Sequence, residues 1–286
     1  QNSNISSYSM KYIISFLIII LSFQTYAQRW EHVYEEAYNF SSTITCSRKT
    51  YDGGYLISRK SNRHQYVLIK TDVNGNINWM KRIFNEEYNV FSGDYISVTE
   101  SGLIFISGCV KCSSDNYCSH VMCLDECGEL LWSKYFDLNV YNYAMHVFGN
   151  DDGSAFVHTR YAGQHNGAIP IERAQLIKLN NEGNIEWINH IIPFYEYDYI
   201  YDVDFQNAEQ SDHGILFTGR CWIHDPSTNL LRLKGIIVET DQFGNELFVD
   251  YYNHNQVDSI NGELLYSKKY NDYYLTTGYE YLYDSA

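Results

Sequence analysis

Basic residues and catalytic signatures are both scarce in this sequence. Its 20 Lys and Arg are outnumbered by 35 Asp and Glu, which gives a formal net charge of −15. An acidic surface repels phosphate backbones, so we expect no nucleic acid partner. The chain also has no G-x-S-x-G, H-E-x-x-H or phosphate-binding loop motif. The sequence therefore offers no catalytic set of a familiar kind.

The sequence also lacks an apolar run long enough to cross a bilayer as a helix, so no stable membrane span is expected. Its most apolar stretch, residues 12–23, is too short. This stretch follows Met10 and Lys11 and precedes Thr25-Tyr26-Ala27, which is the order of a secretory signal and its cleavage site. We expect residues 1–9 to be upstream or non-native, 10–27 to be a signal peptide and 28–286 to be the mature domain. The expected location is secreted or cell-surface.

What the sequence does contain is a short motif, D/N-x-x-G-x-x-x-W/F, that occurs four times. In the first copy Asn74-Gly75 lies between two apolar runs, which is a strong hairpin signal because the turn needs positive φ. The turn glycines are Gly75, Gly128, Gly183 and Gly244, and the aromatic residues four positions later are Trp79, Trp132, Trp187 and Phe248. Spacings of 53 to 61 residues between these glycines indicate a repeat architecture.

Two further strands precede each hairpin, so every unit has four strands in the order A, B, C, D. In the first unit they are predicted at 43–48, 55–60, 66–71 and 77–83. Four-stranded antiparallel units of this period are typical of β-propeller blades, which bury their faces by stacking on neighbours. The predicted fold is an all-β propeller with blades at 43–83, 95–136, 143–192 and 199–252. An aromatic content of 16%, with 28 Tyr, agrees with strands.

The blade count is left open between two alternatives. Trp30 lies in a strand-like segment, 29–36, that resembles the second half of the hairpin. This segment could complete a partial blade at 259–286 and close a ring of about five blades. Otherwise the chain is a truncated larger propeller. In either case Trp30, Trp79, Trp132, Trp187 and Phe248 are expected to pack each against the next blade, and a monomer is expected.

The repeats resemble those of a known group of proteins. D-G-G-Y-L-I-S at 52–58 and Y-V-L-I-K-T-D-V-N-G-N-I-N-W at 66–79 are similar to the β-propeller repeats of secreted bacterial proteins, often exported by the type IX system. The resemblance covers Trp30 to about Gly278 and implies the fold. The G-x-x-x-W half also resembles the blade-docking motif of quinoprotein dehydrogenases, although the Asp stands one residue further from the Gly there. Resemblance of fold alone does not carry an activity.

Five of the seven cysteines cluster, at 109, 112, 118, 123 and 127. Cys112 and Cys118 flank a short tip between strands B and C, where hairpin pairing places them opposite one another. An oxidising compartment favours disulfides, with Cys109 and Cys123 as further candidates. Four nearby thiolates could alternatively hold zinc.

The turn Asp72-x-Asn74-x-Asn76 raises the possibility of bound Ca²⁺. The glycine lies inside the triplet, however, and no closing Glu follows as it does in an EF-hand loop. Side chains that hydrogen-bond to their own turn explain these residues better. No cofactor is therefore expected.

Acidic and aromatic residues gather in the predicted loops between strand D and the next strand A. In a propeller these loops surround one mouth of the central channel, where they could bind a cation or stack on sugar rings. The alternative is that each Asp or Asn caps the strand that follows it. The candidate ligand residues are Tyr88, Asp94, Tyr141, Asn142, Tyr195, Tyr197, Asp198 and Asp258.

Arginines occur at equivalent ends of strand B in three blades, as Arg59, Arg160 and Arg220. Converging arginines suit bidentate recognition of a carboxylate, and the set resembles the carboxylate clamp of sialidases. No nucleophile or acid can be assigned beside it. The favoured function is a non-enzymatic binding scaffold for a glycan or a surface protein. The alternatives are a sialidase-like hydrolase or quinoprotein-type enzyme, and an architectural segment of a longer exported protein.

Overall fold

The fold is given by a computed structural model, which describes residues 42–61, 66–83, 91–112, 117–138, 141–163, 171–191, 199–225, 230–252, 260–270 and 273–282. The predicted signal segment, Trp30 and the segment 29–36 lie outside these ranges.

The described strands form four four-stranded sheets, here called blades 1 to 4, and one two-stranded sheet. Blade 1 contains β1 (Ser42–Lys49), β2 (Tyr55–Ser61), β3 (Tyr66–Thr71) and β4 (Ile77–Ile83). Blade 2 contains β5 (Phe91–Val98), β6 (Ile104–Lys111), β7 (Tyr117–Leu124) and β8 (Leu130–Phe136). Blade 3 contains β9 (Tyr141–Gly149), β10 (Ala155–Gly163), β11 (Ile171–Leu179) and β12 (Ile185–Ile191). Blade 4 contains β13 (Tyr199–Gln210), β14 (Ile215–Asp225), β15 (Leu230–Thr240) and β16 (Glu246–Tyr252), and β17 (Ile260–Tyr270) pairs with β18 (Tyr273–Leu282).

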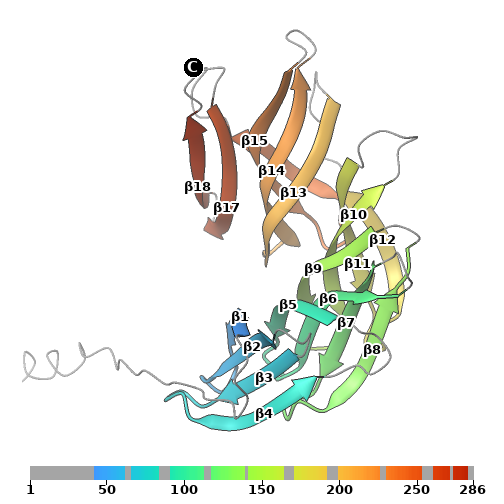
Figure 1. The fold of residues 1–286 in the computed structure, drawn as a ribbon, viewed down its shortest axis with the longest axis vertical. Coiled ribbons are helices and arrows are strands. Elements are labelled where there is room, and N and C mark those ends of the chain that lie inside the picture. The colour runs from blue at the N-terminus through green and yellow to red at the C-terminus, as the bar shows by residue number, and fades with distance from the viewer. Residues whose placement is uncertain are drawn as a thin grey trace, which may run out of the picture.

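Every blade is an antiparallel meander in which consecutive strands pair in sequence order. The sheets follow one another along an arc, with β1 and β5 on its concave side and β4 and β8 on its convex side (Figure 1). This is a β-propeller of four-stranded antiparallel blades, as predicted. The hairpin strands of blade 1, 66–71 and 77–83, have the predicted bounds.

The middle strands are apolar because both of their faces are covered. All six residues of β3 are buried, as are seven of eight in β6 and in β7. The outer strand β4 instead alternates between exposed and half-buried residues, since one of its faces meets solvent. Strands that are buried on both faces read as continuous hydrophobic runs, which is why the repeat was visible in the sequence.

The hydrophobic core consists of layers between blades rather than one central mass. One cluster combines Leu56 and Leu68 of blade 1 with Ile104 and Ile106 of blade 2. Phe105, between those two isoleucines, points to the other face and joins a second cluster with blade 3. A third cluster joins blades 3 and 4. Successive side chains of a strand point to opposite faces, so each blade contributes to two layers and is stable only beside its neighbours.

Of the five aromatic residues predicted to pack against the next blade, Trp79, Trp132 and Trp187 lie against its turn. A Cβ added to Gly128 of blade 2 would lie 3.0 Å from Trp79 Cη2 of blade 1. At Gly183 it would lie 2.7 Å from Trp132 Cε3, and at Gly244 3.1 Å from Trp187 Cζ3. These glycines also have φ between +74° and +79°. The Gly and the Trp of one motif therefore serve two successive interfaces.

The acidic residues of these turns bind their own backbone. Asp72 Oδ1 accepts hydrogen bonds from the N–H groups of Asn74 and Asn76, both at 2.8 Å, and Oδ2 accepts one from Asn76 Nδ2 at 2.9 Å. Asp241 makes the same three bonds within its turn. This arrangement is the Asx turn expected for such residues, and it accounts for the spacing that raised the possibility of Ca²⁺.

Three predicted loop residues, Asp94, Tyr141 and Asn142, lie inside strands. The inner strands of blades 2 and 3 begin at Phe91 and Tyr141, earlier than predicted. Asp94 is the extra residue of a β-bulge, because the pairing with β6 passes from Gly93 directly to Tyr95. The expectation that Asp94 and Asn142 precede their strands is therefore wrong. Bulges re-aim side chains without ending a strand, and nothing in the local composition reveals them.

Candidate functional site

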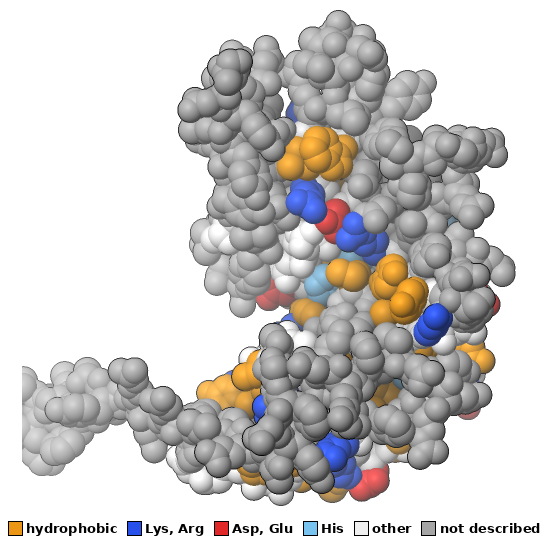
Figure 2. Space-filling view, viewed as in Figure 1, with side chains coloured by type: hydrophobic (Ala, Val, Ile, Leu, Met, Phe, Trp, Pro, Cys, Tyr) orange, Lys and Arg blue, Asp and Glu red, His pale blue; other side chains and the backbone are white. Residues whose placement is uncertain are grey.

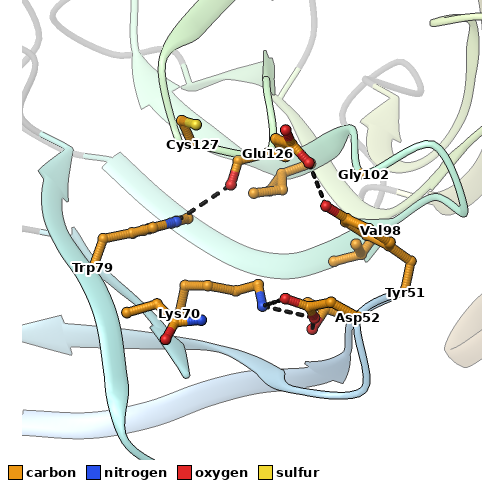
Figure 3. A pocket seen from close by; sticks show the side chains of 11 residues that line it. Tyr51, Asp52, Lys70, Trp79, Val98, Gly102, Glu126 and Cys127 are labelled. Atoms are coloured by element: carbon orange, nitrogen blue, oxygen red, sulfur yellow. Dashed lines mark hydrogen bonds and ion pairs between the residues drawn. The ribbon is translucent and has the colours of Figure 1, made fainter. Parts of the chain in front are cut away.

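A pocket of about 150 Å³ opens between blades 1 and 2 on the side of the turns. Figure 3 shows its walls: Trp79 on one side, Tyr51 on the other, Lys70 and Asp52 at one end and Glu126 at the opposite end. Tyr51 and Asp52 come from the turn between β1 and β2, Lys70 from β3 and Trp79 from β4. Glu126 belongs to the β7–β8 turn of blade 2. The pocket therefore exists only where two blades meet.

The polar end of the pocket is a partly buried ion pair. Lys70 Nζ donates to Asp52 Oδ1 at 2.8 Å and to Oδ2 at 2.6 Å. The Lys70 side chain is 7% exposed, whereas that of Asp52 is 38% exposed. Burial alone would raise the pKa of Asp52, but hydrogen bonds from Lys70, the Thr50 hydroxyl and the Gly54 N–H lower it to about 2. Asp52 is thus ionised and partly open to solvent.

The aromatic walls are fixed by contacts with blade 2. Trp79 Nε1 donates to the Glu126 carbonyl oxygen at 3.3 Å, and the Tyr51 hydroxyl donates to the Glu126 carboxylate. The hydrogen bond to the Glu126 carboxylate favours the protonated phenol, so the pKa of Tyr51 is raised. Two rings from blade 1 are therefore held apart by one residue of blade 2, and Cys127 with its exposed thiol lies beside them.

The same construction recurs between blades 3 and 4, in a pocket of about 420 Å³. Asp152, Lys178 and Trp187 stand where Asp52, Lys70 and Trp79 stand in blade 1. Lys178 Nζ lies 4.1 Å from the centroid of the Phe156 ring and donates to Ser154 Oγ at 2.8 Å. The β15–β16 turn contributes Gln242 and Phe243, which correspond to Glu126 and Cys127.

One position of strand C sets the chemistry of each interface. It lies directly opposite the ladder aromatic and is Lys70, Cys123, Lys178 and Glu239 in blades 1 to 4. Burial raises the pKa of the Cys123 thiol to about 12, so this position is uncharged in blade 2. In blade 4 an acid takes the place of the Lys, and Glu239 Oε1 lies 3.4 Å from His213 Nδ1 of the β13–β14 turn. The pocket between blades 1 and 2 and the pocket between blades 3 and 4 are thus of one type, with a Lys at this position.

The predicted arginines lie elsewhere, toward the concave side of the arc. Arg160 Nη1 is 3.3 Å from Asp204 Oδ1, and Arg220 Nη2 donates to Asp204 Oδ2 at 3.0 Å. Figure 2 shows basic and acidic side chains meeting in this hollow beside histidine and apolar groups. Asp204 occupies the position that a ligand carboxylate would take in an arginine clamp. Arg59 is half-buried on β2 of blade 1, whereas Arg160 and Arg220 lie on blades 3 and 4.

Two histidines of blade 3 lie buried on the same side. His146 Nδ1 and His158 Nδ1 are 3.0 Å apart, so one ring donates its N–H to the other. Burial, together with Arg48, lowers the pKa of His146 to about 3. The pKa of His158 is depressed well below its usual value by burial and by the charges of His146 and Arg160. Both rings are neutral near pH 7.

Asn142, another predicted site residue, lines none of the described pockets. Asn142 is fully buried, where Ser119 Oγ donates to its Oδ1 and its Nδ2 donates to Gln175 Oε1 at 3.4 Å. It joins blades 2 and 3 and does not face solvent. Tyr141 and Asp94 are placed on β9 and β5 by their backbone. The remaining candidates lie outside the described residues: Tyr88, Tyr195, Tyr197, Asp198 and Asp258.

The disulfide prediction is confirmed for one pair. Cys112 and Cys118 form a bridge with a Cα–Cα distance of 5.8 Å. Cys109 and Cys123, the other two candidates, remain buried thiols. Cys109 faces Ser119 across the sheet and Cys123 faces Phe105, so neither has a cysteine partner in its register.

Among the described residues, one group of three potential metal ligands comes together, and two of its members are the disulfide cysteines with Asp137 as the third. Within the same residues no helix has the length and apolar character needed to cross a membrane.

Comparisons with known proteins identify no family. No family model matches the chain, and no curated protein matches its sequence. A solved structure of a protein of unknown function from Bacteroides caccae is similar with a TM-score of 0.36 at 12% identity, over 74% of this chain and 81% of that one. An ACO/RPE65 chimera gives a TM-score of 0.46 at 9% identity, over 84% of this chain and 56% of the chimera. The chain thus spans little more than half of the chimera. Both TM-scores are below 0.5, so neither likeness carries an argument.

Sequence reasoning missed the turn-side pockets. It placed the site at the loops between β4 and β5 and their equivalents, whereas both described pockets of this type lie at the opposite ends of the strands. The sequence did contain a signal for them. In blades 1 and 3 an Asp-Gly pair precedes strand B, and a Lys on strand C lies opposite the Trp of strand D. It could not be used until the register between β3 and β4 was known.

Proposed function

We propose that the chain is a binding module for carbohydrates, located outside the cell, and that its ligand sites are the pockets between blades 1 and 2 and between blades 3 and 4. The observation that carries the proposal is the repetition of one Asp–Lys–Trp arrangement at both interfaces. Packing of the blades requires the Trp, but it does not require a solvent-accessible acid beside it.

The chemistry of the first pocket suits a sugar ring. Trp79 and Tyr51 offer two aromatic walls for the apolar faces of a pyranose, and aromatic rings supply apolar area with little loss of conformational freedom. Asp52 and Glu126 can accept hydrogen bonds from ring hydroxyls, while Lys70 holds the Asp52 carboxylate in place. A few polar groups at the ends of an apolar slot are typical of small-ligand sites. The volume of about 150 Å³ matches one ring rather than a long chain.

The proposed location rests on the disulfide and on the repeats. The Cys112–Cys118 bridge is compatible with an oxidising compartment. The similarity to exported bacterial repeats supports secretion, including by the type IX route. The chain could instead be an architectural segment of a longer exported protein. That role needs the blades but no ligand in the pockets, so a measurement of ligand binding distinguishes the two functions.

A glycan array tests the proposal with the full chain and two pocket variants. Tyr51→Ala removes one wall of the first pocket, and Phe243→Ala removes an exposed ring of the second. Tyr135→Ala is the matched control, because Tyr135 is 51% exposed, similar to Tyr51 at 53%, and lines neither pocket. We expect glycan signals that fall by about half in each pocket variant, because each variant loses one of the two pockets, and that persist in the control. Signals at background, or equal in all four proteins, would overturn the proposal.

A further inference from the structure

A third and larger pocket, of about 680 Å³, lies where the inner strands of the four blades come together. Its walls include Arg48 and Lys49 of β1, Tyr95 of β5, Phe148 of β9 and Glu209 of β13. No single interface builds it, since each inner strand contributes one wall. Its size is within the usual range for sites that enclose a small molecule.

A cation is positioned on the side of blade 1. The guanidinium carbon of Arg48 lies 4.3 Å from the centroid of the Tyr95 ring, and Arg48 Nη1 donates to the Ser47 carbonyl oxygen at 3.0 Å. Tyr95 is itself anchored across the hollow, because its hydroxyl donates to the Ala208 carbonyl oxygen at 3.5 Å. A guanidinium stacked on a ring keeps its remaining N–H donors in one plane for a second partner.

An anion faces the same pocket from blade 4. Glu209 is half-buried on β13, next to Ala208. Arg48 and Glu209 both act on the phenol of Tyr95, the first favouring its ionised form and the second opposing it. Burial is the largest influence and raises the pKa of Tyr95. The hydroxyl of Tyr95 is therefore close enough to both Arg48 and Glu209 to be affected by their charges.

The remaining walls are apolar or neutral. Val147 and Phe148 are buried, and Ile96 and Val98 line the side formed by β5. Asn207 and Gln210 add amide groups on β13. A ligand that fits these walls has an apolar body, a negative group at one end and a positive group at the other.

We infer that this pocket binds a short zwitterionic peptide with apolar side chains, its carboxylate on Arg48 and its ammonium on Glu209. Arg pairs with a carboxylate through two parallel hydrogen bonds. A carboxylate has about four acceptor positions, so Glu209 can accept from an ammonium while keeping its protein contacts. A polyanion would meet repulsion from Glu209 and from the overall charge of −15. A neutral sugar would leave both charges unmatched. This site is independent of the two inter-blade pockets.

Calorimetric titration of the full chain with the dipeptide Leu-Phe tests the inference, with its N-acetylated and C-amidated forms as the blocked probes. We expect binding of the free dipeptide, a loss of at least tenfold in affinity in Arg48→Gln and in Glu209→Gln, and a similar loss with each blocked form. Once a protein charge has been removed, blocking the peptide group that it binds should have no further effect on affinity. Binding of the N-acetylated form should therefore be insensitive to Glu209→Gln.

Matched controls remove the same kinds of charge outside the pocket. Lys111→Gln and Glu100→Gln alter exposed residues that do not line it, and both should bind the dipeptide like the parent chain. If Arg48→Gln fails to fold, Arg48→Lys keeps the charge and loses the paired donors, and it should still weaken binding. Undetectable binding of the free dipeptide, or equal affinity for free and blocked forms, would overturn the inference. Neither outcome would affect glycan binding.

Discussion

The indole of Trp79 in blade 1 rests against the Cα of Gly128 in blade 2, at a position where a methyl group would lie 3.0 Å from the ring. The same relationship joins Trp132 to Gly183 at the next interface. Gly128 and Gly183 are therefore each required twice, once for a positive φ and once for the ring of the preceding blade.

Gly183→Ala separates these two requirements when it is compared with Gly53→Ala. Gly53 has a φ of +82° but nothing within 4 Å of an added Cβ, so its substitution introduces backbone strain alone. We expect Gly53→Ala to lower the free energy of unfolding by about 1 kcal/mol. Gly183→Ala adds a clash and should lower it by about 3 kcal/mol. Urea unfolding measures both. Equal losses would show that the ring contact contributes nothing.

Stability should fall as the pH drops below the ordinary histidine pKa of about 6.5. His120 and His146 have pKa values lowered by burial, to about 4 and about 3, and that of His158 is also depressed. Between about pH 6.5 and pH 4 the unfolded chain binds protons that the folded chain does not. Each histidine should then remove about 1.4 kcal/mol of stability per pH unit.

His158→Gln tests this expectation, because Gln cannot take up a proton. The slope of unfolding free energy against pH should become shallower in the variant, whatever its stability at pH 7. Unfolding free energies at four or five pH values would measure it. An unchanged slope would show that His158 is not buried as a neutral ring.

Lys70→Met should release the carboxyl of Asp52. The pKa of Asp52 is about 2 because hydrogen bonds from Lys70, Thr50 and Gly54 outweigh burial. Loss of the Lys70 donor should raise it toward its ordinary value of 3.8. The depressed pKa stabilises the fold above about pH 3.8, and this contribution disappears as the pH falls to about 2. Carbon-detected NMR titration of the carboxyl group measures the shift, and an unchanged pKa would contradict the ion pair.

Thiol chemistry should distinguish the five cysteines that form no disulfide from the Cys112–Cys118 bridge. Cys127 is exposed, whereas Cys46, Cys109, Cys123 and Cys221 are buried. A thiol reagent should label one cysteine in the native chain and five in denaturant without reductant. Reduction should expose two more and lower stability by about 2 kcal/mol, because the bridge closes a short loop. Seven reactive thiols before reduction would contradict the bridge.

The repeat made the fold predictable from the sequence, but it did not predict the contacts between blades. The positive φ of Gly75, the buried run of β3 and the packing of Trp79 are local or periodic features, so the sequence alone predicts them. Asp204, by contrast, became a partner of Arg160 only through contact between blades 3 and 4. Neither its spacing nor its neighbours mark it. The pockets likewise depend on the offset between blades, which no single motif encodes.

Calorimetric titration with the strongest glycan from the array tests the central claim most directly. Two inter-blade pockets predict two binding events per chain, one lost in Tyr51→Ala, the other lost in Phe243→Ala, and both lost in the double variant. Saturating Leu-Phe dipeptide should change neither event. A single event that survives both substitutions would contradict the assignment of ligand binding to the interfaces between blades.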